Sequence, residues 1–191
     1  MLYVLSQILY ITDIIAFAAA QMQKKKSTYI LLFMLADFLF ALHYLCLESY
    51  SAVTFVANET VLLLVIYFIQ KYGNNKYTLL ASALTIAADI TACVLMWSTP
   101  LVLFALTATT LTCIGMSSRQ IVFSKSLAIV SIICTTIYLY IIHSYVAAII
   151  NTCMILVAIY GLVVSIINYN NLKKLQEYNT EQLKTQKTPS V

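Results

Sequence analysis

The sequence has few charged residues and few of the residues that interrupt helices. Only 9% of its 191 residues are charged, whereas 62% are hydrophobic. The chain contains three glycines and two prolines. A water-soluble domain carries roughly a quarter charged residues, so this composition leaves too little polar surface for a soluble fold. A lipid bilayer suits the chain better, because it tolerates an apolar exterior and helices satisfy their own backbone polar groups.

The chain also lacks the patterns that carry catalysis or metal binding. Its five cysteines are scattered through hydrophobic runs without a CxxC pair or a histidine at ligand spacing, so we expect neither a metal site nor a disulfide framework. No Ser/His/Asp set, HExxH motif or glycine-rich phosphate loop occurs, and we therefore expect no enzyme and no cofactor. The lysines lie beside hydrophobic runs rather than among aromatics, which favours a membrane surface over nucleic acid as partner.

Long apolar runs predict seven transmembrane helices, each near the roughly 20 residues that a helix needs to cross a bilayer. The predicted spans are 2–22, 28–46, 51–70, 77–97, 100–118, 124–142 and 144–168. Lys71 to Lys76 forms one polar loop, and Trp97-Ser-Thr-Pro100 marks another boundary. Apolar residues continue on both sides of His143, so six helices with one long bent span remain the alternative. Beyond residue 168 the tail is polar; we expect a short helix from Asn171 to Leu183 and a disordered end.

The distribution of basic residues predicts the orientation. All eleven lie in loops on one side of the predicted membrane: Lys24, Lys25, Lys26, Lys71, Lys76, Arg119, Lys125, Lys173, Lys174, Lys184 and Lys187. The loops of the other side carry Glu48 and His143 instead. The positive-inside rule then places the N-terminus outside and the C-terminus in the cytoplasm. Residues 1–20 lack a basic start and contain Asp13, so we interpret them as a retained helix rather than a signal peptide.

The two ends of the chain share a pattern. Ser49-Tyr50 matches Ser144-Tyr145, an alanine follows each tyrosine by two residues, and the next helix carries one asparagine, Asn58 or Asn151. We therefore predict an all-α membrane protein with two parallel three-helix repeats joined by a linker helix, a 3+1+3 plan. The expected divisions are 1–70 for the first repeat, 71–98 for the linker loop and helix, 99–168 for the second repeat and 169–191 for the cytoplasmic tail.

This plan resembles the SWEET, PQ-loop and PnuC group of small-solute transporters. Within it, the segment His43-Tyr-Leu-Cys-Leu-Glu-Ser-Tyr-Ser-Ala52 is similar to the turn between the second and third helices of the YgjV family of bacterial inner-membrane proteins. The Pro-Gln pair that names the PQ-loop group is missing, since neither Gln21 nor Gln23 has a proline beside it. The resemblance implies transport of a sugar, nucleoside or vitamin-like solute, with Asn58 and Asn151 at the positions of the substrate-binding asparagines of SWEET proteins.

Four acidic side chains lie near the middle of predicted spans, where no lysine or arginine is available: Asp13, Asp37, Glu59 and Asp89. An ionised carboxylate at the bilayer centre costs about 2.5–3.5 kcal/mol. We therefore expect these groups to face the bundle interior, with at least one protonated at neutral pH, and to couple transport to protons or to a cation. The alternative is that they are neutral acids hydrogen-bonded to neighbouring helices.

Each of the remaining polar candidates can have a functional role or a purely structural one. Asn58 and Asn151 suit a hydrogen-bonding solute, or else a helix–helix hydrogen bond. His43 and Tyr44 are gate candidates; both histidines are expected to be hydrated at the outer rim, and Tyr44 follows Asp37 by two turns. The threonines of span 100–118 are expected mostly to bond their own backbone. Those residues are Thr107, Thr109, Thr110 and Thr112.

Two functions follow from these residues. The first is a small-solute carrier with a midplane site between the repeats, and the second is a non-transporting membrane subunit or receptor whose polar core is structural. The sequence leaves open whether the chain forms a homo-oligomer.

Overall fold

The computed structural model describes residues 2–48, 50–72, 76–95, 102–141, 143 and 145–186, with side chains except at 2, 3, 51, 76 and 178–186. Seven α helices and no strand occupy these ranges. They are α1 (Leu2–Gln21), α2 (Lys26–Cys46), α3 (Tyr50–Tyr72), α4 (Lys76–Leu95), α5 (Val102–Ser117), α6 (Ile121–Ile141) and α7 (Tyr145–Gln186). The predicted all-helical class is thereby confirmed.

Six of the helices, all except α5, are long and apolar enough to cross a membrane. The predicted span 100–118 appears as α5 with 16 residues, shorter than the other candidates. The predicted boundary at Trp97 to Pro100 lies outside the described residues. Two residues with left-handed backbone, Glu48 (φ 58°) and His143 (φ 61°), follow α2 and α6. The turn at His143 separates α6 from α7, so the alternative of six helices with one long bent span is wrong.

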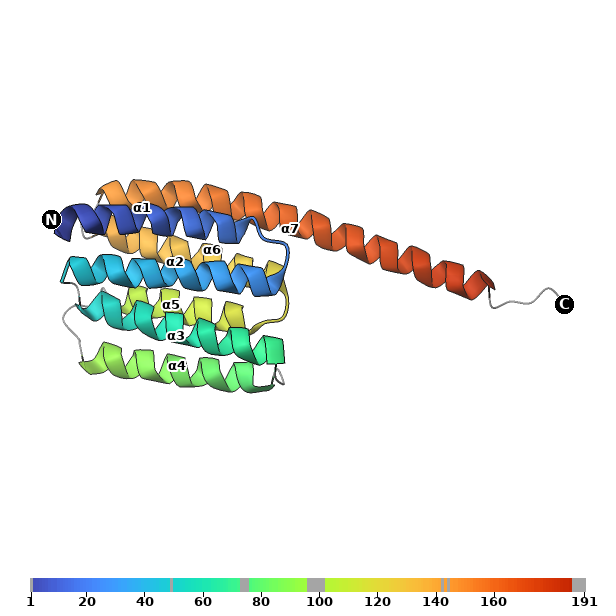
Figure 1. Cartoon of the computed structure of the whole chain (residues 1–191), viewed down its shortest axis with the longest axis horizontal. Coiled ribbons are helices and arrows are strands. Elements are labelled where there is room, and N and C mark those ends of the chain that lie inside the picture. Colours follow the sequence, from blue (N-terminus) through green and yellow to red (C-terminus); the bar gives the residue numbers. More distant parts are fainter. Residues whose placement is uncertain are drawn as a thin grey trace.

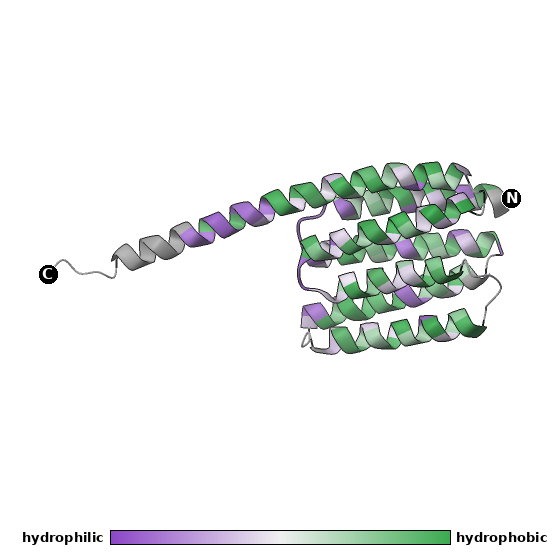
Figure 2. Cartoon of the chain, turned by 180° about the vertical axis from the view of Figure 1, so that it is seen from behind, coloured by the Kyte–Doolittle hydropathy of each residue, from purple (hydrophilic) through white to green (hydrophobic). Residues whose placement is uncertain are grey.

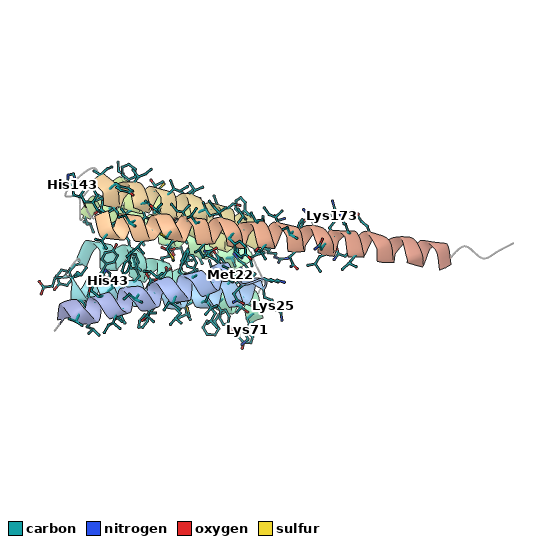
Figure 3. All side chains as sticks on the ribbon, turned by 90° about the horizontal axis from the view of Figure 1, so that it is seen from above. Met22, Lys25, His43, Lys71, His143 and Lys173 are labelled. Atoms are coloured by element: carbon teal, nitrogen blue, oxygen red, sulfur yellow. The ribbon has the colours of Figure 1, made fainter. Side chains whose placement is uncertain are left out.

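The helices pack in two layers (Figure 1). Helices α1 to α4 lie side by side in chain order, and α5, α6 and α7 lie behind them. Consecutive helices contact one another throughout, and α3·α5 and α1·α7 contacts join the layers. His43 and His143 lie at one end of the bundle, whereas Met22, Lys25 and Lys71 lie at the other (Figure 3). We call these the outer end and the basic end.

Helix α7 continues far beyond the bundle at the basic end (Figure 1). The predicted helix from Asn171 to Leu183 is therefore the distal part of one unbroken 42-residue helix. The expectation of disorder is wrong as far as Gln186, and residues 187–191 lie outside the described ranges.

Polarity is reversed relative to a soluble bundle. Large apolar side chains face outward, among them Val94 (68% exposed) and Leu156 (66%), and most of the ribbon of the bundle is coloured as hydrophobic in Figure 2. Buried positions include Asp89, Lys125 and many serines and threonines between helices. Such an exterior is stable only against lipid, since water would penalise it.

Candidate functional site

The four midplane acids lie one on each helix of the first layer. Asp13 comes from α1, Asp37 from α2, Glu59 from α3 and Asp89 from α4. Asp37 lies within electrostatic range of Asp13 and of Glu59, and Glu59 lies within range of Asp89. Because the four helices are adjacent in chain order, the acids form one row across the layer. We call this set the carboxyl row.

No cation balances the carboxyl row. Across the described ranges the one ion pair is Lys173 with Glu177 (N–O 3.9 Å), on the exposed extension of α7. No group of three or more His, Cys, Asp or Glu side chains in these ranges is arranged to hold a metal ion. Glu59 is 7% exposed and Asp89 fully buried, so water does not compensate them.

Two oxygens of the row lack any hydrogen-bond partner. Asn58 Nδ2 donates to Asp89 Oδ1 at 2.9 Å and so joins α3 to α4. The other oxygen, Asp89 Oδ2, and also Asp37 Oδ2 are buried and unpartnered. Buried polar atoms are normally satisfied, so these oxygens are suited to a proton or to a donor group of a bound molecule.

The second layer adds hydroxyl groups to the row. Thr112 of α5 interacts with Glu59, and its Oγ1 lies 3.1 Å from Ala108 O and 3.2 Å from Ser131 Oγ on α6. Thr109, one turn earlier, interacts with Asp89. The sequence interpretation missed Thr112 and Ser131 as site residues. Their signal was the i, i+3 spacing of Thr109 and Thr112, which places both on one face.

The predicted backbone bonding of the α5 threonines is confirmed where the structure gives a bond. Thr107 Oγ1 donates to Leu103 O at 2.7 Å, and Thr109 Oγ1 to Leu106 O at 3.1 Å. Thr112 makes the same kind of bond while also reaching Ser131. A backbone bond therefore does not prevent a threonine from joining a polar site.

The two asparagines have different surroundings. Asn58 is occupied by Asp89, whereas Asn151 lies half-buried on α7, whose main contacts are with α6 and α1. The sequence residues Ser49 and Ser144, which helped to define the repeat, lie outside the described residues. A common site formed by both asparagines stays a prediction.

His43 is not a hydrated histidine. It is 8% exposed, and its Nδ1 lies 2.9 Å from Ser6 O and 3.0 Å from Ser6 Oγ. Its ring stacks on Tyr10 at 5.0 Å and lies 5.4 Å from the Tyr44 ring. His43 does lie toward the outer end (Figure 3), but the expected hydration is wrong, because the start of α1 covers its side chain.

His143 does match the expected rim position. It is exposed in the turn between α6 and α7, and its Nδ1 lies 2.8 Å from Tyr145 Oη. The gate role predicted for His43 and Tyr44 is not tested by this packing, which shows instead that the pair belongs to an aromatic contact between α1 and α2.

A pocket opens away from the carboxyl row, at the basic end between α4 and α5. Its volume is about 340 Å³. The residues that line it are Thr78, Leu79, Ile114, Ser117, Ser118 and Arg119. It contains none of the predicted site residues.

Residues 4–166 match the family model Imp-YgjV, described as a bacterial inner membrane protein. No curated protein and no solved structure matches the chain. The matched region covers all seven helices except the ends of α1 and α7.

Proposed function

Because the chain belongs to the YgjV family of bacterial inner membrane proteins, we propose that it carries a small polar solute across that membrane. The observation that carries the proposal is the carboxyl row: four acids on four adjacent apolar helices, two of them with unpartnered oxygens, and no ion-pairing cation among the residues that the structure describes. Ionisable groups at membrane depth are costly and mark ion or substrate pathways.

The proposal includes the membrane orientation and the repeat. The N-terminus lies outside and the C-terminus in the cytoplasm, because the basic residues gather at the end from which α7 projects. Glu48-Ser-Tyr50 and His143-Ser-Tyr145 support two parallel triplets joined by α4, since each turn begins with a left-handed residue after the second helix of its triplet. The solute site lies between the triplets, with Asn58 and Asn151 as substrate-binding residues.

The roles within the site follow from chemistry. Asn58 and Asn151 each donate and accept hydrogen bonds, which suits a sugar, a nucleoside or a vitamin-like solute. Asp13, Asp37, Glu59 and Asp89 exchange protons or a cation during the transport cycle. His43 and Tyr44, at the outer end of α2, form a gate toward the outside.

The test is uptake into proteoliposomes of a solute first selected by thermal-shift screening of sugars, nucleosides and vitamins. Glu59→Gln keeps the size and hydrogen bonding of the side chain but removes its proton. We expect it to abolish accumulation driven by a proton gradient while retaining exchange of labelled for unlabelled solute. Glu177→Gln, on the exposed extension, is the matched control and should transport normally. Full gradient-driven uptake by the Glu59→Gln variant would show that Glu59 does not couple transport to protons.

The asparagines are tested in the same assay. Replacing both Asn58 and Asn151 by alanine should abolish uptake and exchange alike, because the substrate contacts are lost. Unchanged uptake by the double variant would refute the proposed substrate site, whatever the outcome for Glu59.

A non-transporting subunit or receptor is the second candidate, favoured by the Asn58–Asp89 bond between α3 and α4. Polar side chains also hold membrane helices together. This function predicts that Asn58→Ala lowers the thermal stability in detergent and that no solute in the screen stabilises the wild type.

A further inference from the structure

The basic end contains a second polar cluster, built from other residues than the carboxyl row, although its Tyr29 lies within electrostatic range of Asp37 and Glu59. Lys125 is 1% exposed, and its ammonium group donates to Gln21 O, Gln23 O (2.9 Å), Gly161 O (3.2 Å) and Ser165 Oγ (2.8 Å). Three N–H groups are thus shared among four acceptors on α1, the following loop and α7. All three N–H groups of Lys125 are therefore used, and the lysine holds α1, the following loop and α7 together around the cluster.

A second ammonium group lies close by. Lys26, the first residue of α2, donates to Ser124 Oγ and lies 3.9 Å from the sulfur of Met116. Its Nζ is 5.5 Å from the centroid of the Tyr29 ring, and the Nζ of Lys125 is 5.7 Å from the same centroid. No carboxylate in the described ranges pairs with either lysine. The nitrogens of two lysines therefore lie near one aromatic ring without a paired carboxylate.

Unpartnered polar groups converge on the same place. Tyr29 and Gln21 are both fully buried. The Gln21 side chain faces the Tyr29 hydroxyl, yet the Tyr29 hydroxyl and both ends of the Gln21 amide complete no hydrogen bond. Leaving such atoms without partners is costly, so a third group between them is expected to bind them.

The donors identify the class of ligand. Tyr29 offers an O–H, Gln21 offers its NH₂, and Lys26 retains an N–H beyond its contacts with Ser124 and Met116. Three donors of this kind, with the nitrogens of two lysines close by, match an oxyanion, and lysine is a common partner of phosphate. We propose that the basic ends of α1, α2 and α6 form a binding site for a phosphate group, with Lys26, Tyr29 and Gln21 as its donors.

The depth of the site fits this chemistry. Gln21 ends one candidate span and Lys26 begins the next, so the cluster lies where lipid phosphates lie. The neighbouring Lys24 and Lys25 are exposed and attract anions to the entrance. The phosphate can belong to the headgroup of an anionic lipid or to a free ion. The site does not depend on the proposed transport.

The experiment compares the thermal unfolding of the full chain in an uncharged detergent with two probes, inorganic phosphate and short-chain phosphatidylglycerol. A ligand at ten times its dissociation constant raises the Tm of a chain of this size by roughly 3–6 °C. Because phosphate also stabilises proteins by exclusion from their surface, the result is the difference between variants. Lys26→Met and Tyr29→Phe should lose the shift, whereas Lys24→Met, which removes an exposed charge of the same loop, should keep it.

The pattern of responses identifies the source of the phosphate. A shift with inorganic phosphate indicates a free ion, and a shift with phosphatidylglycerol alone indicates a lipid headgroup. Phosphorus NMR gives a measurement that needs no unfolding transition: the signal of the probe should broaden with the wild type and not with Tyr29→Phe. Equal shifts and equal broadening in all variants, or none in the wild type, would overturn the proposal.

Discussion

At the scale of single residues, Lys125 joins three helices through one ammonium group. Its four acceptors belong to the end of α1, the loop after it, and α7, while the lysine itself comes from α6. The carbonyls at the end of α1 carry the negative pole of that helix, so the contact is electrostatic as well as hydrogen-bonded. The cluster is buried within the protein, so these carbonyls have no water in exchange.

Replacing Lys125 by methionine should therefore lower the stability strongly. The variant keeps the apolar stem but leaves buried carbonyls without a donor, at a cost on the order of 2–3 kcal/mol. Thermal unfolding in detergent measures the loss. Lys173→Met, on the exposed extension, removes the same charge and should change the stability by less than about 0.5 kcal/mol. Equal effects of the two variants would show that the network contributes nothing.

The sequence predicted the depth of polar residues better than their partners. The four acids were identifiable because each lies in the middle of an apolar run. The hydrogen bond from Asn58 to Asp89 could not be predicted, because 31 positions separate the two residues. The rotation of each helix about its axis decides whether they meet. Lys125 was counted among the loop charges, and its burial follows from the position of α6 behind α1, which no local pattern shows.

At the scale of helices, close approach depends on small residues. A Cβ added at Gly161 of α7 would collide with the Gln21 carbonyl oxygen of α1. At Gly115 of α5 the nearest atom would be Leu127 Cβ of α6 at 3.1 Å, a milder conflict. Small residues let membrane helices approach closely, and here the glycine also brings its own carbonyl to Lys125.

Gly161→Ala should destabilise the protein more than Gly115→Ala. In the first variant the obstacle is backbone at the end of a helix, which cannot give way without shifting α7 from α1. We expect a loss of roughly 1–3 kcal/mol for Gly161→Ala and a smaller one for Gly115→Ala, measured as Tm in detergent. A larger loss for Gly115→Ala would mean that the α1·α7 contact is loose.

The number of helices could be predicted from the sequence, but the length of some helices could not. Charge clusters and turn residues marked the breaks, including the disputed one at His143. The end of α7 was misjudged only after Leu183, because a disordered end was expected where the helix continues to Gln186. No glycine or proline occurs between Asn171 and Gln186, and lysine, glutamine and glutamate favour helix in water as well as at a membrane surface.

At the scale of the whole molecule, the exposed lysines lie at the same end of the bundle as the extension of α7. The basic end carries both the exposed lysines and the α7 extension, and the outer end carries His143 in a short turn. Between the two ends the helices are mostly hydrophobic (Figure 2), and their exposed apolar side chains are the part that lipid covers. The two-layer order of helices could not be read from the sequence, because apolar runs specify spans but not neighbours.

The proposed orientation predicts where probes react. In a variant without native cysteines, cysteine at position 143 should react with a membrane-impermeant maleimide from outside intact cells. Cysteine at position 173 should react only after the inner membrane is opened. Labelling of both positions from one side would show that α7 does not cross the membrane and would contradict the proposed seven crossings and the repeat.

The unbroken continuation of α7 has a practical consequence for imaging. From residue 169 to Gln186 it extends roughly 27 Å at 1.5 Å per residue. A partner protein fused through a continuous helix after Gln186 would have a fixed orientation relative to the bundle. Each residue inserted at the junction would rotate the partner by about 100° about the helix axis. A chain of 21.4 kDa, too small for single-particle cryo-electron microscopy by itself, thereby gains a rigid handle for alignment.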